Sequence, residues 1–214
     1  MAKITFVGAG STVFAKNILG DSMCTPVLQD SEIALYDVDK QHLSESATVI
    51  RGLNRKINSG RAKIKTYLGT RERRKALSGA DFVVNAIQVG GYDPCTITDF
   101  EIPKKYGLRQ TIADTIGIGG IFRVLRTFPV MLDFTRDMEK VCPDAWLLNY
   151  TNPMCALTGG ILRQTEIRTV GLCHSVQACA STLLRNVDML DEVENLQWKI
   201  AGINHMAWLL EITD

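Results

Sequence analysis

The sequence predicts an α/β fold in which parallel strands alternate with helices, and three observations support this prediction. Short apolar runs alternate with helical patterns over most of the 214 residues. The first run, at 3–8, leads into a glycine-containing turn and then a helical pattern. The second run, at 32–36, is followed at once by an acidic residue, Asp37. Strands and helices that alternate in this way form a parallel sheet with helices packed on its faces.

Each expected element follows from its own local pattern. The apolar runs predict strands at 3–8, 32–36, 63–67, 82–86, 146–149 and 170–173. Apolar residues at helical spacing predict helices at 12–20, 40–58, 70–78, 121–140, 154–164 and 176–186. Pro129 lies inside the fourth of these helices, where we expect it to kink or split the helix, and Pro143 closes that helix.

The pattern changes at Gln197. Two apolar runs follow, at 198–203 and 207–212, and we expect them to be strands of a second, α+β unit. We therefore place a first domain at 1–172 and the incomplete start of a second at 173–214. The element order of the first domain predicts a doubly wound, Rossmann-like sheet.

The turn after the first strand has the composition of a phosphate-binding turn. Gly8 and Gly10 stand in the turn, and Ser11 and Thr12 open the following helix. Such a turn lets backbone N–H groups approach a pyrophosphate at a helix N-terminus, where the helix dipole favours negative charge. Val13 replaces the third glycine of the dinucleotide fingerprint, but that glycine mainly serves helix–strand packing. The turn therefore predicts a dinucleotide cofactor.

The ends of two further strands point to the rest of a cofactor site. Asp37 is placed to accept hydrogen bonds from the adenosine ribose, and its charge would repel a 2′-phosphate, which favours NAD over NADP. The alternative is that Asp37 caps the next helix. The run containing Asn85 leads to Gly90, at the carboxyl end of a strand, where ligands bind in such sheets. The alternative for Gly90 is an ordinary loop.

Composition excludes several classes of protein. The net charge of +1 and the absence of a basic face argue against a nucleic-acid partner. No apolar stretch reaches the length of a membrane span, and the N-terminus lacks a signal peptide. None of the six cysteines has Cys-x-x-Cys spacing, so we expect no zinc cage but reduced thiols in the cytoplasm.

Three clusters of reactive side chains follow predicted strands. The first contains Asn149 and Asn152, and Asn152 either contacts a substrate or forms a turn beside its proline. The other two contain Cys173 with His174, and His205. A thiolate and an imidazole suit a borderline divalent metal with open coordination positions. The alternative is a buried cysteine and a hydrogen-bonded core histidine.

Taken together, these stretches resemble glycoside hydrolase family 4. The matching segments are 4–12, 90–92, 112–115, 149–153, 173–177 and 202–208, so the resemblance covers essentially the whole chain. It implies an NAD- and metal-dependent glycosidase on a lactate/malate-dehydrogenase-like scaffold. Cys-His-Ser-Val at 173–176 with Ile-Ala-Asp-Thr at 112–115 looks most like the α-galactosidase branch. The phospho-glycosidase branch carries Asp or Asn in place of His174 and an arginine near Cys95.

The resemblance also implies a reaction and a metal. Melibiose-like α-galactosides would be hydrolysed by NAD-dependent oxidation at C3, elimination between C2 and C1, addition of water and re-reduction. Motif matching makes Cys173 and His205 the ligands of a divalent metal, Mn²⁺ in this family. Family members continue well beyond residue 214, where their C2 base lies, and the full-length form is expected to be a homo-oligomer.

Further roles follow from the same resemblance. His174 either gives a proton to the leaving oxygen or binds a sugar hydroxyl. Asp114 is a polar contact or base near the ring, with a helix cap as its alternative. Asn152 and Asn149 are expected to contact the substrate.

Two other functions stay open at this point. One is an NAD-dependent 2-hydroxy acid dehydrogenase, with Arg123 and Arg126 as a carboxylate clamp. That function would leave Cys173 and His205 without a purpose. The other is a catalytically silent NAD-binding fragment.

Overall fold

The larger part of the molecule is a six-stranded parallel sheet. The computed structural model describes residues 1–112 and 115–214. The strands are β1 (Lys3–Val7), β2 (Glu32–Asp37), β3 (Lys63–Leu68), β4 (Phe82–Asn85), β5 (Trp146–Asn149) and β6 (Arg168–Gly171). Their order is β3-β2-β1-β4-β5-β6, which confirms the doubly wound, Rossmann-like prediction. The order reverses between β1 and β4, and the crevice at such a reversal is where these sheets bind ligands.

The strand register brings the functional strand ends to one edge of the sheet. Val7 pairs with Tyr36 on one side and with Asn85 on the other. Asn85 pairs in turn with Asn149, and Asn149 with Gly171. The segments that leave these strands therefore start side by side.

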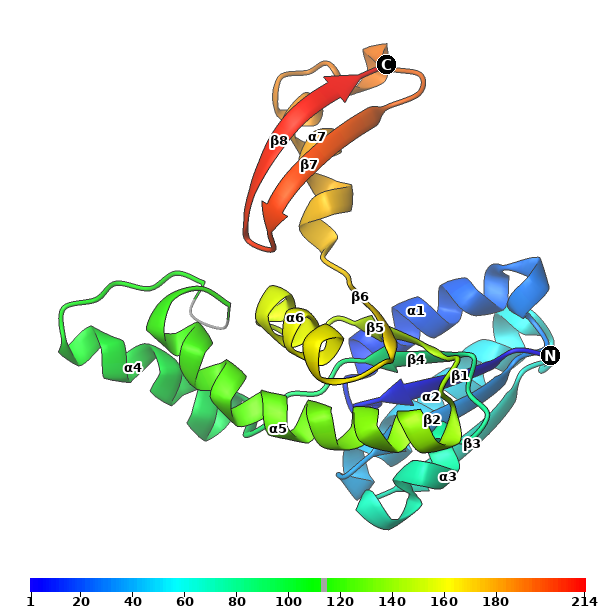
Figure 1. Ribbon diagram of the computed structural model, residues 1–214. Helices are drawn as coiled ribbons and strands as arrows, with labels where there is room; N and C mark the ends of the chain where they lie inside the picture. Colours follow the sequence, from blue (N-terminus) through cyan, green and yellow to red (C-terminus); the bar gives the residue numbers. More distant parts are fainter. Residues whose placement is uncertain (113–114) are drawn as a thin grey trace.

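Helices cover both faces of the sheet, with α1 (Thr12–Cys24) and α2 (Lys40–Asn58) on one face and α3 (Arg73–Leu77), α5 (Gly117–Val141) and α6 (Met154–Gln164) on the other. Of the other two helices, α4 (Ile97–Lys105) packs on α5, and α7 (His174–Asn186) follows β6 and packs on β8. Short helical turns are η1 (Pro26–Leu28), η2 (Thr70–Glu72), η3 (Gly91–Thr96) and η4 (Leu190–Glu192). Figure 1 shows that α5 runs along the same face of the sheet as α3.

The core lies in two layers, one on each face of the sheet. On one face, Leu19 of α1 and Ile50 of α2 pack with Phe6 of β1. On the other, Phe134 of α5 and Leu157 of α6 pack in the cluster that contains buried β4 and β5 side chains. Burial of a large apolar side chain contributes roughly 1.5–3 kcal/mol, so these layers hold the strand ends rigidly.

Most predicted elements are confirmed, and the differences have local causes. The sixth strand lies at Arg168–Gly171 rather than 170–173, and the helix predicted at 70–78 divides into η2 and α3. Pro129 does not split its helix, because α5 is continuous from Gly117 to Val141. α4 was not predicted, since its buried face includes the polar Asp99 and a proline instead of an apolar stripe.

A smaller unit follows β6. It consists of α7, η4 and an antiparallel hairpin of β7 (Gln197–Ile203) and β8 (Met206–Thr213), which confirms the two strands expected after Gln197. Figure 1 shows the hairpin standing away from the parallel sheet, with its turn directed toward α6. Within residues 1–112 and 115–214, no helix combines the length and apolarity needed to cross a bilayer.

Candidate functional site

A cleft of about 650 Å³ opens over the carboxyl ends of β1, β2 and β4. It has the size of a ligand pocket and lies at the reversal of strand order. Four of the predicted cofactor residues and the ribose-binding candidate line it: Gly8, Gly10, Ser11, Gly90 and Asp37. The cleft therefore lies where the sequence predicts the dinucleotide to bind.

The glycine turn after β1 lies close to the backbone that follows β4. Gly8 has φ of +85°, and a Cβ there would lie 2.9 Å from the carbonyl carbon and oxygen of Ala86. The helix after the turn begins at Thr12, and its N-cap, Ser11, makes no side-chain capping bond. A phosphate can thus take the place of a capping side chain at the N-terminus of α1.

Asp37 faces the glycine turn rather than the next helix. Its Oδ2 accepts a 2.6 Å hydrogen bond from the Gly10 N–H, and its Oδ1 accepts one of 2.9 Å from the Asp39 N–H. The cap of α2 is Asp39, whose Oδ1 accepts from the His42 N–H at 2.8 Å. The capping alternative for Asp37 is therefore wrong, while its contact with ribose stays a prediction.

An arginine that the sequence did not single out also lines the cleft. The Nη2 atom of Arg73 lies 2.8 Å from Asp133 Oδ2 and 2.5 Å from Asp137 Oδ2. Burial alone would raise the pKa of Asp137, but hydrogen bonds from Arg74 and Arg73 outweigh it and hold the pKa below its usual value. An arginine committed to two carboxylates offers little to a 2′-phosphate, so the local charge favours NAD.

Two predicted cofactor residues, Thr12 and Asn85, do not line the cleft. Thr12 Oγ1 lies 2.7 Å from Ser46 Oγ, and Asn85 is fully buried beneath the strand ends. Asn85 Nδ2 donates to Asn149 Oδ1 at 2.9 Å and to Thr151 Oγ1 at 3.1 Å. Their direct contact with a cofactor stays a prediction.

Asn149 belongs to the same buried network. Its Nδ2 donates to Thr158 Oγ1 at 3.1 Å and to the Thr151 carbonyl at 3.3 Å. The network joins the ends of β4 and β5 to α6. The Oδ1 atom of Asn85 has no hydrogen-bond partner in the described structure. The substrate contact expected of Asn149 stays a prediction.

His174 packs into a group of three aromatic rings. Its ring centroid lies 5.5 Å from that of Phe14 on α1 and 6.2 Å from that of Tyr150 after β5. Phe14 and Tyr150 are 5.8 Å apart, edge to face. Burial raises the pKa of the Tyr150 hydroxyl, and Asp21 adds to the effect. The three rings connect the cofactor helix to the start of α7.

Cys173 and His205 open into a second cavity, of about 300 Å³. Cys173 is the N-cap of α7, and His205 lies in the turn between β7 and β8 with φ of +64°. Among the described residues, no group of three or more His, Cys, Asp or Glu side chains could hold a metal. A thiolate and an imidazole suit a divalent transition metal. The pair therefore fits a partial metal site with positions left for substrate or water.

The remaining candidates are Asn152, the two arginines and Asp114. Asn152 Oδ1 accepts from Asn204 Nδ2 at 2.8 Å, and its carbonyl accepts from Arg123 Nε at 3.1 Å. Arg126 forms a two-point ion pair with buried Asp99, at 2.6 and 3.1 Å. Its guanidinium is thus already paired. Asp114 lies outside the described residues.

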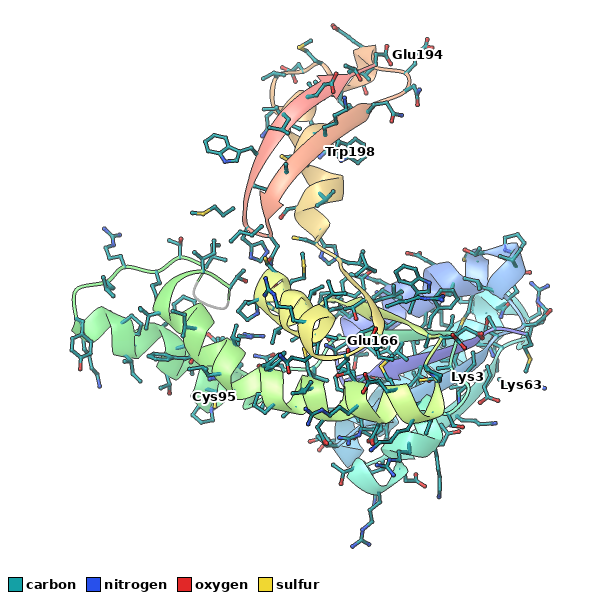
Figure 2. All side chains as sticks on the ribbon, viewed as in Figure 1. Lys3, Lys63, Cys95, Glu166, Glu194 and Trp198 are labelled. Carbon is teal, nitrogen blue, oxygen red and sulfur yellow. The ribbon has the colours of Figure 1, made fainter. Side chains whose placement is uncertain are left out.

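Cys95 packs against Gly90, one of the residues that line the cleft. A Cβ on Gly90 would meet both the Cys95 sulfur and Arg126 Cδ, so the three residues are packed together. Figure 2 shows Cys95 near α5, far from the hairpin that carries Trp198. All six cysteines have free sulfurs.

Comparison with curated sequences gives close relatives. An α-galactosidase from Bacillus subtilis (strain 168) is 58% identical over 212 residues, which is 99% of this chain and 48% of the relative. An α-galactosidase from Rhizobium meliloti (strain 1021) is 36% identical over 211 residues, which is 98% of this chain and 42% of that relative. The chain thus spans about half the length of the curated relatives it matches.

Solved structures agree in fold. A 6-phospho-α-glucosidase from gut microorganisms, in complex with NAD and Mn²⁺, has a TM-score of 0.85 and 20% identity, covering 100% of this chain and 47% of its own. A malate dehydrogenase from Picrophilus torridus has a TM-score of 0.66 and 17% identity, covering 98% of this chain and 57% of its own. The dehydrogenase-like scaffold is therefore confirmed. The family model described as "Family 4 glycosyl hydrolase" matches residues 3–189, and the chain accordingly belongs to that family.

Proposed function

We propose that this chain carries the cofactor and metal sites of an α-galactosidase that acts on melibiose-like substrates. The observation that carries the proposal is the opening of Cys173 and His205 into one cavity, although they lie 32 positions apart in the sequence. The 58% identity to an α-galactosidase supports a galactoside as substrate. The reaction would be oxidation at C3, elimination between C2 and C1, hydration and re-reduction.

The cofactor residues act by binding and orienting NAD. Gly8 and Gly10 leave room for the pyrophosphate, the N-terminus of α1 receives its charge, and Asp37 takes the ribose hydroxyls. When bound, NAD supplies a reversible hydride acceptor and a divalent metal, proposed here as Mn²⁺, supplies a Lewis acid. Cys173 and His205 would hold that metal.

His174 is the proposed proton donor to the leaving oxygen, because an imidazole transfers protons readily near neutral pH. Phe14 and Tyr150 would limit the movement of its ring. Binding of a sugar hydroxyl is the second role open to His174. Asn152 and Asn149 are proposed as substrate contacts and Asp114 as a polar contact or base.

A 2-hydroxy acid dehydrogenase is the weaker candidate. It needs an arginine free to bind a carboxylate, and the Arg126 guanidinium already makes a two-point ion pair with Asp99. A dehydrogenase would also produce NADH in proportion to product, whereas the proposed glycosidase would use NAD without net consumption.

Hydrolysis of p-nitrophenyl α-galactoside tests the proposal. NAD⁺, Mn²⁺ and a thiol reductant are each omitted in turn, once with the 214-residue chain and once with a chain extended to the length of its relatives. Release of nitrophenol that needs all three supports the proposal. Release by the extended chain alone also supports it and makes the 214-residue chain, if it binds NAD, the catalytically silent fragment. Binding of NAD with no release by either chain contradicts the proposal.

Two further proposals concern the setting of the protein. A thiolate metal ligand such as Cys173 is stable only where thiols stay reduced, which supports the cytoplasm. The full-length form is proposed to be a homo-oligomer.

A further inference from the structure

We propose that Asn204 is the positioning residue that holds His205 in its place opposite Cys173. The inference rests on the proposed metal site, and it assigns a role to a side chain that is not itself a ligand. It starts from the way in which the turn of the hairpin is fixed to the parallel domain.

The Asn204 side chain makes two hydrogen bonds to residues that are distant in the sequence. Its Oδ1 accepts from the Cys155 N–H at 3.1 Å, and its Nδ2 donates to Asn152 Oδ1 at 2.8 Å. Both partners lie at the start of α6, 49 and 52 residues away in sequence. One amide group therefore ties the turn between β7 and β8 to the loop after β5.

The bond to Cys155 fills a gap in the capping of α6. Pro153 is the N-cap of α6 and makes no side-chain capping bond. Cys155 is the second residue of α6, and N–H groups at that position normally bond to a capping side chain. Asn204 supplies the missing acceptor from a distant segment.

Burial shows how specific this anchor is. From Arg185 to Asp214, every residue of which the structure describes, Asn204 is the only buried one. It is 8% exposed, whereas Met206 and Trp208 on the same hairpin are 61% and 76% exposed. A buried amide without hydrogen-bond partners costs about 1–3 kcal/mol, so the two bonds favour a single position of the turn.

The backbone conformation of His205 depends on that position of the turn. Its φ of +64° lies in the left-handed region, which costs a non-glycine residue about 1–2 kcal/mol. Such a conformation persists only where the surroundings hold it. Asn204 immediately precedes it and is fixed at both ends of its amide. The His205 ring thereby reaches the cavity that Cys173 also lines.

The test compares Asn204→Ala with Asn195→Ala. Asn195 is an exposed asparagine of the same unit whose side chain accepts only from Gln197 among the described contacts. Mn²⁺ affinity is measured by the electron paramagnetic resonance signal of the free ion, and NAD affinity by calorimetry. We expect Asn204→Ala to weaken Mn²⁺ binding about 10- to 100-fold, as loss of a ligand-orienting partner does, and to leave NAD binding unchanged. Asn195→Ala is expected to change neither.

A second measurement needs no metal. Hydrogen exchange of the Cys155 amide and the imidazole resonances of His205 are followed by NMR in both variants. In Asn204→Ala the Cys155 amide should exchange faster and the His205 resonances should shift, while those of His42 stay constant. Unchanged His205 resonances, or unchanged Mn²⁺ affinity despite a deprotected Cys155 amide, would overturn the inference.

The two measurements separate this inference from the proposed function. If the unmodified chain binds no Mn²⁺, the proposed function fails, but the metal-free measurement still decides whether Asn204 positions His205. Asn204→Asp adds a check against misfolding, because its carboxylate keeps the acceptor for Cys155 and loses the donor to Asn152. It should retain amide protection at Cys155.

Discussion

The carboxylate of Asp37 and the N–H of Gly10 are joined by a 2.6 Å hydrogen bond. The bond links the end of β2 to the turn that leaves β1, so the acid and the glycine turn form one unit. A Cβ at Gly10 would lie 2.8 Å from the same oxygen, which leaves no room for a larger residue there.

The first prediction concerns cofactor choice. Asp37→Asn should weaken NAD binding about tenfold, because each charge-assisted hydrogen bond to ribose contributes roughly 1.5–3 kcal/mol. It should also reduce the preference for NAD over NADP, since the repelling charge is gone. Calorimetry with both cofactors measures the change, with Asp30→Asn, on an exposed turn, as the control. Equal loss of NAD and NADP affinity would argue against a ribose contact.

The second prediction separates crowding from backbone strain. Gly8 and Gly79 both have positive φ, of +85° and +67°, but a Cβ is crowded only at Gly8. Gly79→Ala should therefore cost about 1 kcal/mol of unfolding free energy and leave NAD binding intact. Gly8→Ala should cost more and abolish NAD binding. Chemical denaturation and calorimetry give the two quantities, and similar behaviour of both variants would refute a close pyrophosphate approach.

The third prediction concerns the six thiols. Mn²⁺ with a substrate analogue should slow alkylation of Cys173, because a metal-bound thiolate is a poor nucleophile. Cys179 lines the same cavity and is exposed, so its alkylation should continue. Burial raises the pKa of the Cys142 thiol to about 11, and Cys142 should react last in every case. Peptide mapping by mass spectrometry identifies each alkylated cysteine. Protection of Cys179 instead of Cys173 would identify Cys179 as the metal ligand.

The fourth prediction concerns stability at low pH. The pKa of Asp137 is lower in the folded chain than in the unfolded chain, so the unfolded state takes up a proton first as the pH falls. The stabilisation by Asp137 is complete above about pH 4 and disappears as the pH falls further.

A pair of variants tests this acid dependence. Asp137→Asn should lower the free energy of unfolding by roughly 3 kcal/mol near neutral pH and flatten its loss in acid, because Asp137 is a buried partner of Arg73. Asp133→Asn, whose side chain is 67% exposed, should cost less than about 1 kcal/mol. Denaturation between pH 2 and 7 measures both. An unchanged acid slope in Asp137→Asn would rule Asp137 out as its source.

The fifth prediction concerns the aromatic group around His174. Phe14→Leu should move the His174 imidazole resonances, since the ring currents of Phe14 are removed, and lower kcat more than it raises KM. Tyr150→Phe keeps both rings and is the matched control. The chain has three histidines, so His42 and His205 serve as internal references. A His174 spectrum that is insensitive to Phe14→Leu would remove Phe14 from any positioning role.

The sequence made the strands and the cofactor turn predictable because both depend on neighbours in the chain. Apolar runs and the spacing of Gly8 and Gly10 are local signals. Arg73 was not predicted as a cleft residue, because its position depends on two carboxylates, Asp133 and Asp137, that lie 60 and 64 residues away. The buried face of α4 was equally hidden, since Asp99 is buried only by virtue of its pairing with Arg126.

The candidate metal site divides in the same way. Cys173 and His205 could be selected by residue type and motif, but their shared cavity could be recognised only in three dimensions. Asn204 carried no signal of its own, because its two partners lie 49 and 52 residues earlier. Long-range hydrogen bonds of single polar side chains leave no periodic trace in a sequence.

Because the register of the β7–β8 hairpin is irregular, the position of its turn depends on the number of residues in each strand. The pairing shifts between Lys199 and Ile200, so that Leu210 is an extra residue on β8. Because of this extra residue, Ile212 and Leu209 share a face although they are three positions apart. Deleting Lys199 from β7 would place Trp198 and Ile200 on opposite faces, or move the Asn204 turn by one residue, about 3.3 Å. Such a displacement exceeds the tolerance of a hydrogen bond, so loss of a residue from β7 should be far more harmful than substitution, whereas loss of Leu210 should only make the pairing regular.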